Sequence, residues 1–251
     1  MKPLSIFGGM LRSEARDGES SSISRTAKIA GLFYLIFILL LPIATKIRSQ
    51  LIMSGDAAAT AQKIMANELL FRISIVTELV SALFFVLAAW ALYALLKRIN
   101  KNLALLFLLL NLIGVAIECV SVLNLSTALS LLSGVEYLTV FSTGQLQAQA
   151  LLNMDMYHNG FIIAQLFFGA WLLPLGYLVY RSGFLPRLLG ILLIIDFIGV
   201  LTHFLQFFLL PGYDVLSYPG YAAGFIAEVS LTLWLLVKGV KENGAFPKRS
   251  G

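Results

Sequence analysis

Six long apolar runs, separated by short polar or basic segments, restrict what this sequence can fold into. Each run is long enough to cross about 30 Å of hydrocarbon at about 1.5 Å of rise per helical residue. The chain of 251 residues is 59% hydrophobic and only 12% charged, whereas a soluble domain carries about 25% charged residues. Because helices satisfy their own backbone groups within lipid, we predict an all-α, polytopic membrane protein with six transmembrane helices.

The predicted membrane domain covers residues 26–240. Its six helices are expected at about residues 28–46, 71–96, 103–132, 157–180, 187–210 and 221–238. Residues 1–25 are rich in Ser, Gly and charge, a composition typical of a disordered tail. Residues 241–251 are expected to form a second, shorter tail.

Two polar connections are long enough to contain structure of their own. Asp56 can cap a short amphipathic helix made of strong helix formers, which is too polar to span and is expected at the surface. Residues 144–154 are compatible with a mildly amphipathic helix at the membrane interface, and equally with a plain ordered loop.

Lys and Arg residues are unevenly distributed along the chain. Of the 18 residues of these two types, all but four lie in the N-terminal and C-terminal segments or in the tight turns 97–101 and 181–187. The four exceptions are Lys46, Arg48, Lys63 and Arg72. Because cytoplasmic connections carry the excess of Lys and Arg, we expect both termini and both turns to be cytoplasmic. The formal charge of +5 is therefore assigned to membrane topology, and no nucleic-acid partner is expected.

Five acidic or histidine side chains fall within the predicted spans, away from the ends of these spans. They are Glu78, Glu118, Asp196, His203 and Glu228. Counted from the nearest cytoplasmic basic residue, Asp196 and Glu228 lie about 14 to 15 Å into the membrane, near the midplane. The other three are expected in the outer leaflet. A charge at mid-bilayer costs roughly 2.5 to 3.5 kcal/mol on insertion scales, so these groups are expected to face the interior of the bundle.

Two of these residues belong to a pattern that occurs twice. Residues 111–118 (NLIGVAIE) and 196–203 (DFIGVLTH) share a polar residue, a glycine and an ionisable residue at positions i, i+3 and i+7. At 100° per residue this spacing puts all three on one helical face. The pattern fits either an internal duplication related by a pseudo-two-fold axis or a chance similarity. In both cases the polar face is expected to point inward.

The ionisable groups permit three interpretations. The leading one is a non-enzymatic module that binds, transports or senses a small polar or amphiphilic molecule or a lipid. Its outward-facing pocket would have Glu78, Glu118 and His203 on the wall and Asp196 and Glu228 at the floor. The second is an intramembrane, possibly metal-dependent, lipid-modifying enzyme with Glu78 or Glu118 as general base and His203 as acid or metal ligand. The third is a structural or assembly partner, in which the same groups only bond neighbouring helices.

Familiar cofactor and metal motifs are absent from the sequence. There is no glycine-rich phosphate loop, no Gly-x-Ser-x-Gly elbow, and no HExxH, His-x-x-x-His or Cys-x-x-Cys pair. No cofactor and no metal site are therefore predicted. The expected partners are the lipid bilayer and a small polar or amphiphilic ligand, and the sequence does not specify protein partners.

Four short segments carry a family resemblance. They are residues 54–61 (SGDAAATA), 92–97 (LYALLK), 180–190 (YRSGFLPRLLG) and 233–239 (LWLLVKG). Over about residues 25–240 the chain resembles the bacterial membrane family catalogued as domain of unknown function 4386. The resemblance implies a protein of several helices in the bacterial cytoplasmic membrane, and it brings no activity or ligand that could be assigned to particular residues.

Overall fold

The computed structural model describes residues 4–240, with side chains from Ser22 onward, and shows an all-α architecture. Six of its helices are long and apolar enough to cross a membrane, which is consistent with the six predicted spans. The helices are α1 (Leu4–Leu51), α2 (Ala57–Ala66), α3 (Glu68–Leu96), α4 (Lys101–Leu132), α5 (Thr143–Arg181), α6 (Arg187–Leu209) and α7 (Tyr218–Val237). Two short 3-10 helices, η1 (Glu136–Leu138) and η2 (Asp214–Ser217), lie in connections. The predicted C-terminal tail, residues 241–251, lies outside the described residues.

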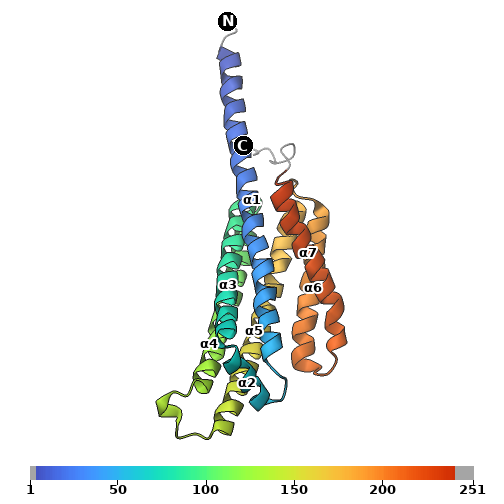
Figure 1. Ribbon diagram of the computed structural model, residues 1–251. Coiled ribbons are helices and arrows are strands. Elements are labelled where there is room, and N and C mark those ends of the chain that lie inside the picture. Colours follow the sequence, from blue (N-terminus) through green and yellow to red (C-terminus); the bar gives the residue numbers. More distant parts are fainter. Residues whose placement is uncertain (1–3, 241–251) are drawn as a thin grey trace.

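Helix α1 is longer at both ends than the predicted span 28–46. It begins at Leu4, within the stretch expected to be a disordered tail, and projects beyond the bundle at that end (Figure 1). Residues 4–27 contain no proline that would interrupt a helix. At its other end α1 passes through Pro42 and continues to Leu51. This continuation brings Arg48 inside the bundle, where it is only 3% exposed.

The polar connections are helical. Asp56 caps α2 as predicted, since its Oδ1 accepts a hydrogen bond from the Ala59 N–H at 2.9 Å. Helix α2 lies across the end of the bundle opposite the start of α1 (Figure 1). The residues predicted as a separate interfacial segment before the fourth span instead belong to α5, one helix of 39 residues. A capping box between Ser142 and Gln145 starts α5 early, and no proline interrupts it before Pro174.

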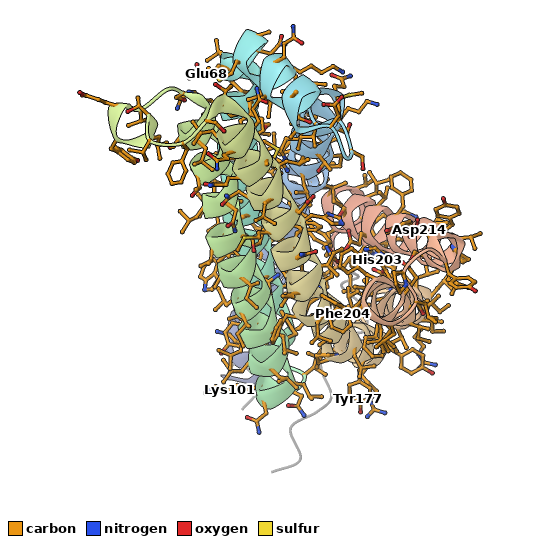
Figure 2. All side chains as sticks on the ribbon, turned by 90° about the horizontal axis from the view of Figure 1, so that it is seen from below. Glu68, Lys101, Tyr177, His203, Phe204 and Asp214 are labelled. Atoms are coloured by element: carbon orange, nitrogen blue, oxygen red, sulfur yellow. The ribbon has the colours of Figure 1, made fainter. Side chains whose placement is uncertain are left out.

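Helices α1, α3, α4 and α5 pack in succession, α1 on α3, α3 on α4 and α4 on α5, and their buried aromatic and aliphatic side chains form the core. Helices α6 and α7 form a hairpin beside this group rather than within it (Figure 2). Small residues set the contacts of the hairpin. Gly176 of α5 packs on Gly190 of α6, and a Cβ on Gly199 of α6 would lie 2.6 Å from the Gly220 Cα of α7. Gly31 of α1 packs on Leu235 and Leu236 near the end of α7.

The hairpin therefore contacts α1 near the N-terminal end of the apolar span. Toward the α2 end, the ribbons of α1 and α7 diverge (Figure 1). The residues that face each other there line a cavity.

Candidate functional site

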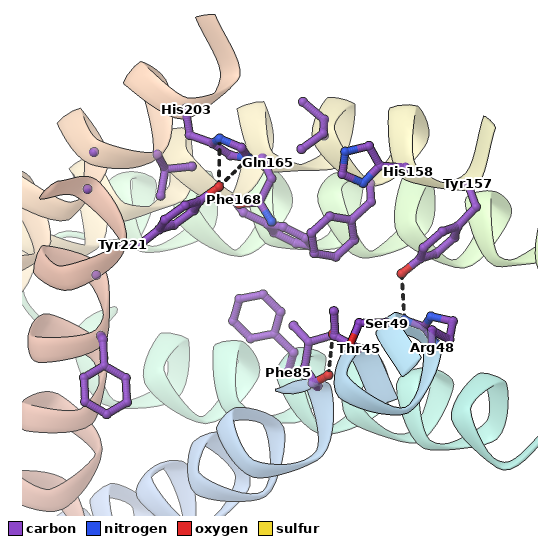
Figure 3. Close-up of a pocket in the computed structure, with 18 of the residues that line it drawn as sticks. Thr45, Arg48, Ser49, Phe85, Tyr157, His158, Gln165, Phe168, His203 and Tyr221 are labelled. Carbon is purple, nitrogen blue, oxygen red and sulfur yellow. Dashed lines mark hydrogen bonds between the residues drawn. The ribbon is translucent and has the colours of Figure 1, made fainter. Parts of the chain in front are cut away.

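The cavity has a volume of about 720 Å³ and lies between α1, α5, α6 and α7. Helix α3 contributes Phe85, and the turn before α2 contributes Ser54 and Gly55. Figure 3 shows side chains of α5, α6 and α7 facing those of α1 across this space. The cavity thus extends from the membrane-spanning region of the bundle to the end at which α2 lies.

One wall of the cavity is aromatic. The rings of Phe37 and Phe85 stack with centroids 4.0 Å apart, and Trp171 meets Phe85 edge-on at 5.1 Å. Phe168 packs on Phe85 at 5.2 Å. All four side chains line the cavity. Because interlocked rings of this kind leave few alternative rotamers, the wall is a preformed apolar surface.

Two carboxylic acids lie on the α6 and α7 side of the cavity. Asp196 is 2% exposed, and its Oδ2 has no hydrogen-bond partner among the described residues. Its other carboxyl oxygen occupies space left by Gly224, where a Cβ would lie only 2.6 Å from Oδ1. Glu228 also lines the cavity, one helical turn beyond Gly224 on the same face of α7. The two carboxyl groups therefore lie close together.

A hydrogen-bonded network holds His203 on the cavity wall. Gln206 Nε2 donates to Asp214 Oδ1 at 3.1 Å, and its Oε1 accepts the Ser217 hydroxyl, also at 3.1 Å. The Ser217 oxygen is then free to accept from His203 Nδ1–H, 3.2 Å away. The Tyr221 hydroxyl lies 3.0 Å from Nδ1 and 3.3 Å from Nε2 of this ring, and with Nδ1–H donating to Ser217 it is Nε2 that accepts the Tyr221 hydroxyl (Figure 3). The network ties α6 to η2 and α7 and fixes the position of the imidazole.

On the opposite side, a buried ion pair joins three helices. Arg48 of α1 donates to the carboxylate of Glu78 in α3, and its Nη2 lies 2.9 Å from the Tyr157 hydroxyl of α5. Tyr157 in turn donates to Glu78, with an O–O distance of 2.8 Å. Arg48 and Tyr157 line the cavity, whereas Glu78 is fully buried behind them. Within the described part of the chain, the only guanidinium on the cavity wall is thus already paired with a carboxylate.

The structure brings three of the five predicted site residues to the cavity and places two elsewhere. Asp196, His203 and Glu228 line it. Glu78 lies behind the wall, and Glu118 is buried in α4, which contributes no residue to the lining. Neither carboxyl oxygen of Glu118 has a hydrogen-bond partner among the described residues.

The polar residues of the cavity wall that the sequence did not predict as site residues include Arg48, Tyr157 and Tyr221, and also Thr45, Ser49, Ser54, Asp155, His158 and Gln165. The distribution of Lys and Arg placed Arg48 among the four basic residues of the outer side and gave it no place in the cavity. A usable signal was available, because no glycine or proline separates Pro42 from Gly55 and a helix could therefore continue past Thr45. The two tyrosines carry no sequence signal that distinguishes them from interface anchors.

Possible metal ligands are dispersed. Among residues 22–240, no three His, Cys, Asp or Glu side chains are placed to hold a metal ion. Cys119 is half-buried in α4, away from the cavity lining. The arrangement therefore offers ligand contacts through aromatic rings, carboxyl groups and hydrogen-bonding side chains.

The fold and its cavity define a class, the polytopic α-helical membrane proteins with a pocket between helices. Residues 29–239 match the family model described as "Domain of unknown function (DUF4386)", and the chain belongs to that family. An uncharacterized protein of Archaeoglobus fulgidus is 27% identical over 161 residues, which cover 62% of this chain and 77% of the relative. No solved structure matches the chain.

Proposed function

We propose that this protein is a non-enzymatic membrane module that binds a small amphiphilic molecule in the cavity between α1, α5, α6 and α7. The observation that supports this function is the composition of the cavity wall. A continuous aromatic surface is combined with the carboxyl groups of the α6 and α7 hairpin and with the His203–Tyr221 pair of the same hairpin. Ligand sites commonly combine an apolar lining with a few oriented polar groups, and they range from about 300 to 1,000 Å³.

The proposed orientation places the α2 end of the cavity outside the cell. The basic turns 97–101 and 181–187 lie at the other end of the bundle, together with the start of the first span (Figure 1). Arg48, one of the four basic residues assigned to the outer side, is paired with Glu78. Its pairing leaves fewer free positive charges on that side and so supports the positive-inside assignment.

The two alternative functions receive less support from the geometry. The enzyme interpretation needs Glu78 or Glu118 to share a space with His203, but neither of these two carboxyl groups lines the cavity. The purely structural interpretation needs the buried polar groups to bond one another. Asp196, which lines the cavity, instead has a buried carboxyl oxygen without a partner among the described residues.

Filling the cavity tests the proposal. Thr45 of α1 lines the cavity and is exposed there, and its hydroxyl bonds the Leu41 carbonyl of its own helix. Thr45→Trp should therefore occlude the space without removing a contact between helices. Thr127→Trp is the matched control, because Thr127 is exposed on α4, makes the equivalent bond to Leu123, and does not line the cavity.

The readout is native mass spectrometry of protein extracted gently from its host membrane. The wild type and Thr127→Trp should retain a bound amphiphile that Thr45→Trp lacks. Equal occupancy in all three proteins, or no retained species in any, would contradict the proposed function.

A further inference from the structure

We infer that the end of the cavity farther from α2, called the inner end, is a cation site formed around Asp196 and Glu228. The ligand of this protein would then be a hydrophobic cation such as an alkyl or aryl ammonium compound. The inference rests on the proposed function and specifies its ligand class. It depends on three features of the inner end, which are a pair of carboxyl groups, the lack of a neutralising cation within the described chain, and aromatic rings at the same depth.

The carboxyl pair is built by close helix packing. Gly199 and Gly220 let the backbones of α6 and α7 touch, and Gly224 leaves room for the Asp196 side chain. Asp196 is thereby directed at the face of α7 that also carries Glu228. Asp196 Oδ2 is buried and has no partner among the described residues, and Asp196 is one of the residues that line the cavity. A buried acceptor without a donor is costly, so this oxygen is suited to a donor or charge supplied from outside the protein.

No basic side chain of the described chain neutralises the pair. The two salt bridges within residues 22–240 join Arg48 to Glu78 and Arg72 to Glu68. His203 is occupied by Ser217 and Tyr221. An ionised carboxyl group in this part of the membrane is expensive unless an opposite charge accompanies it. A cationic ligand would supply that charge.

The aromatic wall lies at the depth of the carboxyl pair. Gly31 of α1 packs on Leu235 of the antiparallel α7. Phe37 lies six residues after Gly31 on α1, and Glu228 lies seven residues before Leu235 on α7. Both are therefore about 10 Å from this contact along the helix axes. On α5, Gly169 packs on Val200 of α6 and Gly176 packs on Gly190, which places Trp171 beside the α6 segment that carries Asp196.

These features select an organic cation over a metal ion. Rings attract a positive charge through their faces and also provide apolar contact area. A hard metal ion needs six or more oxygen ligands, or a set of nitrogen and sulfur ligands. The inner end supplies two carboxyl groups and otherwise mainly carbon surface. A charged nitrogen or phosphorus centre that carries apolar groups fits both surfaces.

The test compares two ions of the same shape and opposite charge. Binding of radiolabelled tetraphenylphosphonium and tetraphenylborate to the purified full-length protein is measured by equilibrium dialysis in neutral detergent, with empty micelles subtracted. The wild type should bind the cation at least about tenfold more tightly than the anion. Asp196→Asn and Glu228→Gln, which keep side-chain size, should each weaken cation binding at least about tenfold.

Glu118→Gln is the matched control, because Glu118 is equally buried but lies outside the cavity lining. It should bind the cation as the wild type does. Circular dichroism and thermal unfolding verify that each variant is folded. If Asp196→Asn does not fold, Asp196→Glu provides a charge-conserving variant. Equal affinities for the two ions, or full cation binding by both neutral variants, would overturn the inference. If Thr45→Trp still expels a retained amphiphile in that case, the binding function stands and only the charge of the ligand is wrong.

Discussion

The stripes 111–118 on α4 and 196–203 on α6 carry the same pattern and lie in different surroundings. Asn111, Gly114 and Glu118 are buried where α4 packs on α5. Asp196 and His203 face the cavity. Both stripes point inward, as the spacing predicts, but only one of them meets an open space. A polar stripe thus determines which face of a helix is turned inward, whereas the packing of the neighbouring helices determines whether that face becomes a site.

Close packing seals the α4 stripe. A Cβ on Gly114 would lie 2.5 Å from the Phe168 ring, and one on Gly160 of α5 would lie 2.0 Å from Ser121 Oγ. Helix α6 has a comparably close contact, between Gly199 and Gly220, but this contact is with α7. The same inward face of α6 therefore remains open toward α1. Whether the two stripes descend from an internal duplication stays a hypothesis.

The largest effect is expected where a sealed carboxylate has a cationic partner. Arg48→Leu leaves the Glu78 carboxyl group fully buried and without its ion-pair partner. It should lower the free energy of unfolding by about 3 to 5 kcal/mol, as is typical of broken buried pairs. Adding Glu78→Leu should recover most of the loss. Asp196→Asn should change stability by less than about 1 kcal/mol, because no ion pair is lost. Denaturant titration in detergent micelles measures all four proteins.

Equal losses in Arg48→Leu and Asp196→Asn would contradict this contrast between a paired and an unpaired carboxyl group. So would a double variant that is less stable than Arg48→Leu alone.

An intermediate effect is expected from a methyl group added to the sealed stripe. Gly114→Ala forces Phe168 to move and should cost about 1 to 3 kcal/mol. Gly144→Ala is the control, because Gly144 lies in the first turn of α5 and an added methyl group would meet no described atom within 4 Å. The control should gain about 0.5 to 1 kcal/mol from helix propensity. Thermal unfolding midpoints report both changes, and a Gly114→Ala protein as stable as the control would mean that α4 and α5 are less closely packed.

The smallest effect is expected at Glu118. Its buried carboxyl group has no partner among the described residues, so Glu118→Met, which keeps the volume, should gain about 1 kcal/mol. Binding of tetraphenylphosphonium should be unchanged. Unfolding and dialysis measurements on one preparation test both expectations. A clear loss of stability or of cation binding would show that Glu118 belongs to the site.

The sequence predicts much of the architecture for a simple physical reason. Lipid requires about 20 apolar residues per span, so the six helices and their inward polar faces can be recognised locally. The burial of Glu78, Glu118 and Asp196 agrees with that reasoning. Caps are also local, as the Asp56 side chain at the start of α2 shows.

What the sequence does not predict depends on contacts between distant segments. Arg48, Glu78 and Tyr157 come from three helices, and nothing near any of them specifies the other two. The cavity likewise depends on where the α6 and α7 hairpin meets α1. The contact of Gly31 sets this meeting point, and Gly31 is far from Asp196 in the sequence.

The most direct test of the account is an experimental density map of the protein purified in native lipid. We expect an elongated, non-protein density between α1, α5, α6 and α7, with one end between Asp196 and Glu228 and its length along Phe37 and Trp171. A map in which α7 closes onto α1 and leaves no space, or in which the space holds only protein side chains, would contradict the central claim.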